Sequence, residues 1–158
     1  MARRLRKTFP HTEATNWAPA LAPWLASEDY FFLDAGSILK RMSEGKLPEK
    51  LFIRPASGFK EFAGAVRTTA SLAHELDFMA QNKNIGPEIL CMAASPIEIS
   101  QEWRFVFAGG ELAGASLYME NGKVNAQNHK TGPEDTPTKL ALETAQLPFF
   151  QNVFDFAL

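Results

Sequence analysis

The sequence predicts an α+β protein in which an antiparallel β-sheet is flanked by helices. Short apolar runs, such as residues 30–33 and 51–54, end at Asp or near Pro and are typical of buried strands. Residues 102–127 alternate apolar and polar side chains around two turn signals, which favours two consecutive hairpins. Capping side chains precede two periodic apolar stretches that lie among the strands and favour helices. With 158 residues, the chain is long enough to bury a core in one domain.

The composition excludes several functional classes. A formal net charge of −2 provides no basic excess for non-specific nucleic-acid binding, and 46% hydrophobic residues are typical of a globular protein. The single cysteine, Cys91, excludes a disulfide within the chain, and its apolar neighbours predict a buried, inert thiol. The three histidines have no metal-ligand spacing, and no apolar run is long enough to span a membrane. We therefore expect a cytoplasmic protein.

Residues 1–29 are expected to form an N-terminal extension with short helical turns, because Pro19 and Pro23 limit any helix there. The basic cluster at positions 3–7 is not followed by an apolar run, so it is not a secretory signal, and we expect a solvated arm. The domain itself spans residues 30–158. Its pattern is compatible with a small lobe at about 51–94 and a sheet lobe at about 95–158.

The first half of the domain alternates strands with helices. The expected elements are a strand at 30–33, a helix at 36–43, strands at 51–54 and 62–66, a helix that begins after Thr68 or Thr69, a strand at 88–94 and a linker at 95–100. Asp34 predicts the cap of the first helix, Gly45 predicts its end, and Pro55 predicts the end of the second strand. The second helix is expected to bury Leu72, Leu76 and Met79, to expose Glu75 and Asp77, and to end at 84–87.

The two hairpins allow a prediction of register. A three-residue loop at 109–111 places Phe107 opposite Ala113, Phe105 opposite Ala115 and Trp103 opposite Leu117, which gives one continuous apolar face. A two-residue Gly-Gly turn would mix the faces, so the longer loop is preferred. The other face then collects Glu102, Arg104, Ser116, Tyr118, Asn125 and Gln127. This polar face could equally well be a solvated side of the sheet.

The end of the chain predicts three further elements. Residues 129–135 read as a loop, and Thr136 followed by Pro137 predicts the start of a helix that ends before Pro148. Residues 150–158 then read as a final strand, which carries Asp155.

Three cations indicate a site for a polyanion. Arg54 and Lys60 lie on either side of a loop that contains Pro and Gly, and Arg104 lies among alternating aromatic residues. Each has a simpler interpretation: Arg54 and Lys60 as solvated surface residues, and Arg104 as the partner of Glu102 in an exposed ion pair worth under about 1 kcal/mol. It is the occurrence of all three together with the polar sheet face that favours a site.

These residues also resemble a known family. The segments LFIRP at 51–55, SGFK at 57–60, FAG at 62–64, EWRFV at 102–106 and ASLY at 115–118 are similar to a clade of ATP-grasp proteins from bacteriophages and bacteria. In that clade an arginine stands where most ATP-grasp enzymes have their second nucleotide-binding lysine. The resemblance covers about residue 30 to the C-terminus, and it implies an ATP-grasp-like fold that is incomplete.

The resemblance implies a role for each candidate residue. ATP-grasp enzymes join a carboxylate to an amine through an acyl-phosphate and require ATP and magnesium. Arg54 and Lys60 would contact the phosphates, with Lys60 alternatively contacting the acidic substrate, and Met92, Ala93 and Ala94 would offer backbone groups to adenine. Arg104 would stabilise charge on the transferred phosphoryl group, while Glu102, Ser116 and Tyr118 would orient that group or the substrate.

One part of the family pattern is missing. The resemblance places Asp155 as the first metal-binding acid, but the sequence given ends at Leu158, before the Glu-x-Asn strand that supplies the other magnesium ligands. The sequence therefore predicts a nucleotide-binding protein related to carboxylate–amine ligases, truncated and impaired or inactive as it stands. The alternative is a small phage-type protein that binds and inhibits a host protein without catalysis.

Overall fold

The computed structural model describes residues 13–20, 29–59, 61–108 and 111–129, together with the single positions 139 and 143. The chain divides into two compact units, one ending at Ile97 and the other beginning at Glu98. Both units are built on antiparallel sheet and the described helices lie mainly in the first, so the α+β class is confirmed. None of the described helices is both long and apolar enough to cross a membrane.

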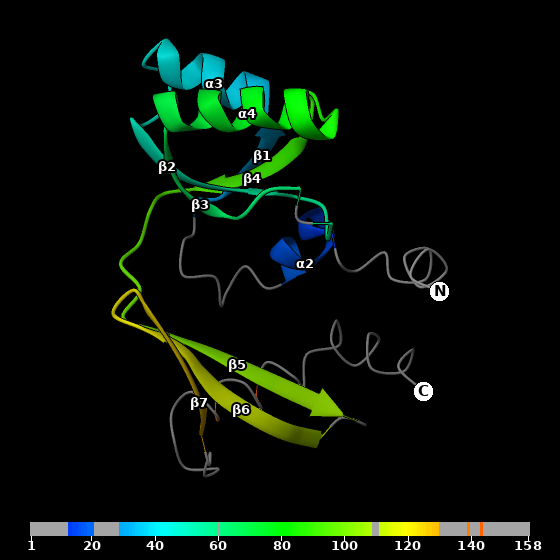
Figure 1. Cartoon of the computed structure of the whole chain (residues 1–158), viewed down its shortest axis with the longest axis vertical. Helices are drawn as coiled ribbons and strands as arrows, with labels where there is room; N and C mark the ends of the chain where they lie inside the picture. Colours follow the sequence, from blue (N-terminus) through cyan, green and yellow to red (C-terminus); the bar gives the residue numbers. More distant parts are fainter. Residues whose placement is uncertain are drawn as a thin grey trace. The chain divides into compact units, whose positions relative to one another are not determined.

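The first unit contains a four-stranded antiparallel sheet in the order β1-β4-β2-β3. The strands are β1 (Phe31–Asp34), β2 (Lys50–Pro55), β3 (Ala65–Thr68) and β4 (Leu90–Ala94). Helices α3 (Ala35–Ser43) and α4 (Thr69–Lys83) lie together on one side of this sheet, and α2 (Ala14–Ala20) lies on the other side (Figure 1). β2 and β4 are therefore the central strands, with a covered face on each side.

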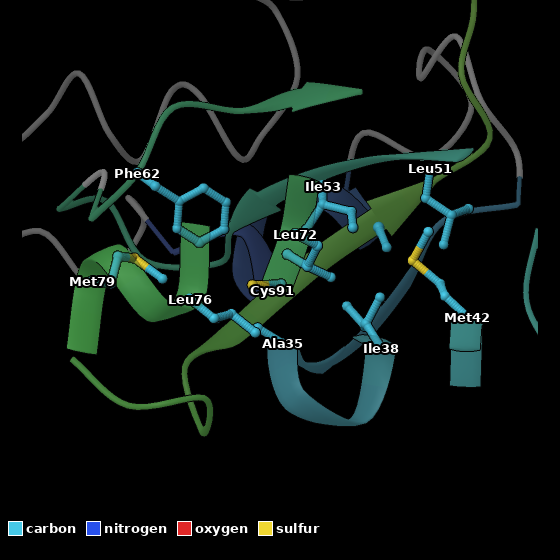
Figure 2. Close-up of a cluster of buried hydrophobic side chains, with 11 residues drawn as sticks. Ala35, Ile38, Met42, Leu51, Ile53, Phe62, Leu72, Leu76, Met79 and Cys91 are labelled. Atoms are coloured by element: carbon cyan, nitrogen blue, oxygen red, sulfur yellow. The ribbon is translucent and has the colours of Figure 1, made fainter. Parts of the chain in front are cut away.

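The main core lies between the sheet and helices α3 and α4 (Figure 2). Strand alternation directs Leu51 and Ile53 of β2 to this side, and both side chains are buried. The helices contribute residues at helical spacing: Ala35, Ile38 and Met42 from α3, and Leu72, Leu76 and Met79 from α4. The predicted inner face of the second helix is confirmed, as is the burial of Cys91.

Both helices begin and end at the signals that the sequence carries. The Asp34 carboxylate accepts a hydrogen bond of 2.8 Å from the Ser37 backbone N–H, and Thr68 forms a reciprocal capping box with Ser71. Gly45, at φ 68°, ends α3, and its N–H donates to the Met42 carbonyl. Asn84 ends α4 in the left-handed conformation.

The third strand lies later than the sequence suggests. The expected strand at 62–66 is wrong by about three residues, because β3 pairs with β2 through Ala65–Thr68. Phe62 is instead buried in the main core. Gly64 lies against β2, where an added Cβ would come within 3.1 Å of both the Arg54 Cβ and the Phe52 ring. Core packing of Phe62 thus overrides the local strand pattern.

The expectation that Glu75 lies on the outer side of the second helix is also wrong. Its carboxylate forms an ion pair of 2.9 Å with the Arg67 guanidinium of β3, and the two side chains are only 21% and 18% exposed. Asp77 is exposed, as expected. The ion pair therefore ties α4 to the edge strand of the sheet.

The second unit contains a three-stranded antiparallel sheet of β5 (Gln101–Ala108), β6 (Glu111–Glu120) and β7 (Lys123–His129). The predicted pairs Phe105 with Ala115 and Trp103 with Leu117 are confirmed. The predicted pair of Phe107 with Ala113 is wrong, since Phe107 lies opposite Leu112. A register shift after Val106 lets a two-residue connection coexist with the expected pairs further along the strands.

A second register shift affects the polar face. Between Leu117 and Met119 the pairing of β6 with β7 shifts, so Gln127 lies opposite Leu117 and Asn128 lies opposite Ser116. Gln127 therefore holds a register position on the apolar side, contrary to expectation. The predicted helix after Pro137 and the predicted strand at 150–158 lie outside the described residues, except that Lys139 and Glu143 are helical.

Candidate functional site

Arg54 lies in a row of side chains that crosses three strands of the first unit. Its register partner on β4 is Met92, whose partner on β1 is Phe32. Because directly paired residues point to the same side of a sheet, all three share the face away from α3 and α4. This is the face on which α2 lies (Figure 1). Ala14 and Ala18 of α2 are buried in a small cluster with Met92 and Ala56.

Arg54 is partly buried, and this changes its electrostatics. Desolvation lowers the pKa of the Arg54 guanidinium, which nevertheless stays charged because arginine begins from a value above 12. Its Nε donates a long hydrogen bond of 3.4 Å to the Pro55 carbonyl. A guanidinium in a partly desolvated position interacts more strongly with an anion than one in bulk water. The position therefore suits the recognition of phosphate.

The loop that follows Arg54 has a defined conformation. The Ala56 N–H donates to the Leu90 carbonyl at 2.9 Å, and the Ala56 carbonyl accepts from Ala14 of α2 at 2.6 Å. Ser57 is hydrogen-bonded to Glu61, and Phe59 is 54% exposed. Lys60, the second predicted cation, lies outside the described residues.

The residues expected near adenine lie in a central strand. Met92 pairs with Phe32 on one side and Arg54 on the other, and Ala93 pairs with Phe31 and Ile53. Their backbone groups therefore point into the sheet on both sides. Only the end of the strand, at Ala94, is paired on one side alone among the described register pairs. A ligand would reach backbone groups from Ala94 onwards more readily than those of Met92 or Ala93.

The other candidates lie in the second unit. Arg104 is exposed on β5 directly opposite Ser116 of β6, so these two share a face of the sheet. Glu102 lies opposite Met119, since the register shifts between Glu102 and Trp103. This shift leaves Tyr118 without a direct partner on β5, and its side chain is not among those described. The structure thus brings together Arg104 and Ser116.

The convergence of Arg54, Lys60 and Arg104 stays a prediction. Arg54 and Arg104 belong to different units, each of which stands by itself here. Asp155 lies outside the described residues, and the described part of the chain contains no group of three or more His, Cys, Asp or Glu suited to a metal. The described residues therefore fit the phosphates of a nucleotide better than they fit its magnesium ion.

A family comparison decides the classification. Residues 36–157 match the family model of an ATP-grasp domain, family 2 of one ATP-grasp clade. The chain belongs to this ATP-grasp family. No curated protein matched the sequence. The matched region includes Arg54, Lys60, Arg104 and Asp155, whereas α2 lies before it.

Membership gives the Arg54 row its functional meaning. ATP-grasp domains in general bind ATP and magnesium, so the chain is an ATP-grasp-like nucleotide-binding protein. The sequence identified Arg54 from the loop beside it but missed Glu61 and Gly64, which hold that loop. The only sequence signal for the first is a serine four residues before a glutamate, a spacing too common to single out.

Proposed function

We propose that the protein binds ATP with magnesium and is related to ATP-dependent carboxylate–amine ligases, with Arg54 as the main phosphate ligand. The observation that supports this most is the position of Arg54: a partly buried guanidinium on the side of the sheet away from α3 and α4, within a matched ATP-grasp domain. A bidentate guanidinium fits two phosphate oxygens without a change in protonation.

The remaining candidates have supporting roles in this proposal. Lys60 adds a second charge to the phosphates or to an acidic substrate, and Asp155 contributes to magnesium binding. Arg104 stabilises charge on the transferred phosphoryl group, with Glu102, Ser116 and Tyr118 orienting the group or the substrate. The backbone that contacts adenine begins at Ala94, since β4 is paired on both sides before it. When bound, magnesium would neutralise phosphate charge and bridge phosphate oxygens.

Calorimetric titration with ATP, in the presence and absence of magnesium, tests the proposal. We expect Arg54→Ala to weaken ATP binding about 10–100-fold, since charge-assisted hydrogen bonds are worth about 1.5–3 kcal/mol. Arg54→Lys keeps the charge and loses the bidentate geometry, so its loss should be smaller. Arg41→Ala, which removes an exposed arginine from α3, serves as the matched control and should bind ATP normally.

The same titration separates the proposal from its competitor. Adenosine lacks phosphates, so its affinity should not depend on Arg54. Equal ATP affinity in Arg54→Ala and the unaltered protein would refute the assignment of Arg54. No binding of ATP at all would favour the alternative, a phage-type protein that binds and inhibits a host protein.

A further inference from the structure

The loop between β2 and β3 is closed by one acidic side chain. The Ser57 hydroxyl lies 2.6 Å from each carboxylate oxygen of Glu61 and donates to them. The Ser57 Oγ in turn accepts a hydrogen bond of 3.1 Å from the Phe59 backbone N–H. Glu61 thereby fixes both a side chain and, through it, the backbone at the exposed tip of the loop.

Glu61 is itself held from outside the loop. Lys83, at the end of α4, donates from its Nζ to the Glu61 carbonyl at 2.5 Å. At the other end of the loop, the backbone of Ala56 is hydrogen-bonded to Leu90 and to Ala14. The loop is therefore anchored at both ends to packed elements, and the Ser57–Glu61 pair sets the conformation between these anchors.

We infer that Glu61 is a positioning residue for nucleotide binding, which rests on the proposed function. Its carboxylate holds Ser57 and the Phe59 backbone in one arrangement before ATP arrives, directly after the strand that carries Arg54. A loop that is already ordered does not lose conformational freedom on binding, so more of the phosphate interaction appears as affinity. Glu61 acts through Ser57 and contacts no ligand.

This role predicts the opposite sign from simple electrostatics. Glu61 carries a negative charge near a site proposed for a polyanion, so its removal should strengthen ATP binding if charge alone matters. If Glu61 positions the loop, its removal should weaken ATP binding. Glutamine at this position removes the charge and keeps an oxygen that accepts from Ser57, so it separates the two effects.

The test compares Glu61→Ala, Glu61→Gln and Ser57→Ala by titration with ATP and with adenosine. We expect Glu61→Ala and Ser57→Ala to weaken ATP binding about tenfold, which corresponds to the loss of one or two hydrogen bonds. Glu61→Gln should bind ATP as tightly as the unaltered protein or more tightly. Glu49→Ala, which removes an exposed acid just before β2, is the matched control for charge and should not weaken ATP binding.

Each outcome decides the inference. Loss of ATP affinity in Glu61→Ala with adenosine affinity unchanged and rescue by Glu61→Gln would support it, since a general loss of folding would lower both affinities. Unchanged or tighter ATP binding in Glu61→Ala would overturn it and leave the proposed function intact. Failure of the unaltered protein to bind ATP would refute the proposed function, and this inference with it.

Discussion

The ion pair between Arg67 and Glu75 provides the sharpest test of how the first unit is held together. It joins β3 to α4 at 2.9 Å, and about four fifths of each side chain is buried. The Arg67 Nε is buried and has no hydrogen-bond partner among the described residues, while an Nη donates to the Ala63 carbonyl at 3.4 Å. Glu75 is therefore the main group that compensates the charge of this guanidinium.

The magnitude of the interaction can be worked from its geometry. At 2.9 Å and an effective dielectric constant of about 20, the gross attraction is about 6 kcal/mol, most of which offsets the cost of desolvating the two charges. Fully buried pairs lose about 3–5 kcal/mol when one partner is removed, and exposed pairs lose under about 1 kcal/mol. For this partly exposed pair we expect Glu75→Ala to cost about 2 kcal/mol of stability.

Urea unfolding of a double-mutant cycle measures this energy. Glu75→Ala should lower the free energy of unfolding by about 2 kcal/mol, and Glu75→Gln by less, because the amide still accepts a hydrogen bond. Arg67→Met combined with Glu75→Leu should recover most of the loss, since no charge is then left without a partner. Asp77→Ala, on the exposed side of α4, is the control. A loss of under about 0.5 kcal/mol in Glu75→Ala would show that solvent already screens the pair.

Two further predictions concern titrating groups of the same unit. Hydrogen bonds from the side chain and backbone of Ser37 lower the pKa of Asp34, so this cap stabilises α3 above the unfolded-state pKa and loses its effect as pH falls through the folded pKa. Asp34→Ala should therefore cost about 1 kcal/mol at pH 7 in urea unfolding and little near pH 2; an equal loss at both values would contradict this. Burial, with smaller effects of Glu61 and Asp34, raises the pKa of the Cys91 thiol to about 12. At pH 8 about one folded molecule in ten thousand carries the thiolate, so iodoacetamide should label Cys91 far more slowly in native than in urea-unfolded protein, and equal rates would refute the burial.

Local signals in the sequence predicted the start and end of each described helix well. Asp34, Thr68 and Gly45 act through backbone groups within a few residues, so their effect does not depend on the rest of the chain. The pairs of Phe105 and Trp103 were also predictable, because strand alternation and burial of one face determine register. Family membership could be predicted from the short segments around Arg54 and Arg104.

Features that depend on distant residues could not be predicted in the same way. The position of β3 depends on where Phe62 packs, and the ion pair of Glu75 depends on a strand that precedes its helix. The register shift at Phe107 is a local insertion that an argument based on strict alternation does not contain. In the candidate site, Glu61 matters through hydrogen bonds to Ser57 and from Lys83, and the latter lies 22 residues away.

The environment of Arg54 gives a physical reason for an arginine at this position. Any cation there is partly desolvated, and desolvation lowers its pKa. A lysine begins from about 10.4 and can lose part of its charge at neutral pH when buried, whereas arginine begins higher and stays charged. The close approach of Gly64 to the Arg54 Cβ limits the room beside the side-chain stem. A planar group that keeps its charge and binds two oxygens at once meets these constraints better than a flexible ammonium, which is why the phosphate contact is assigned to Arg54.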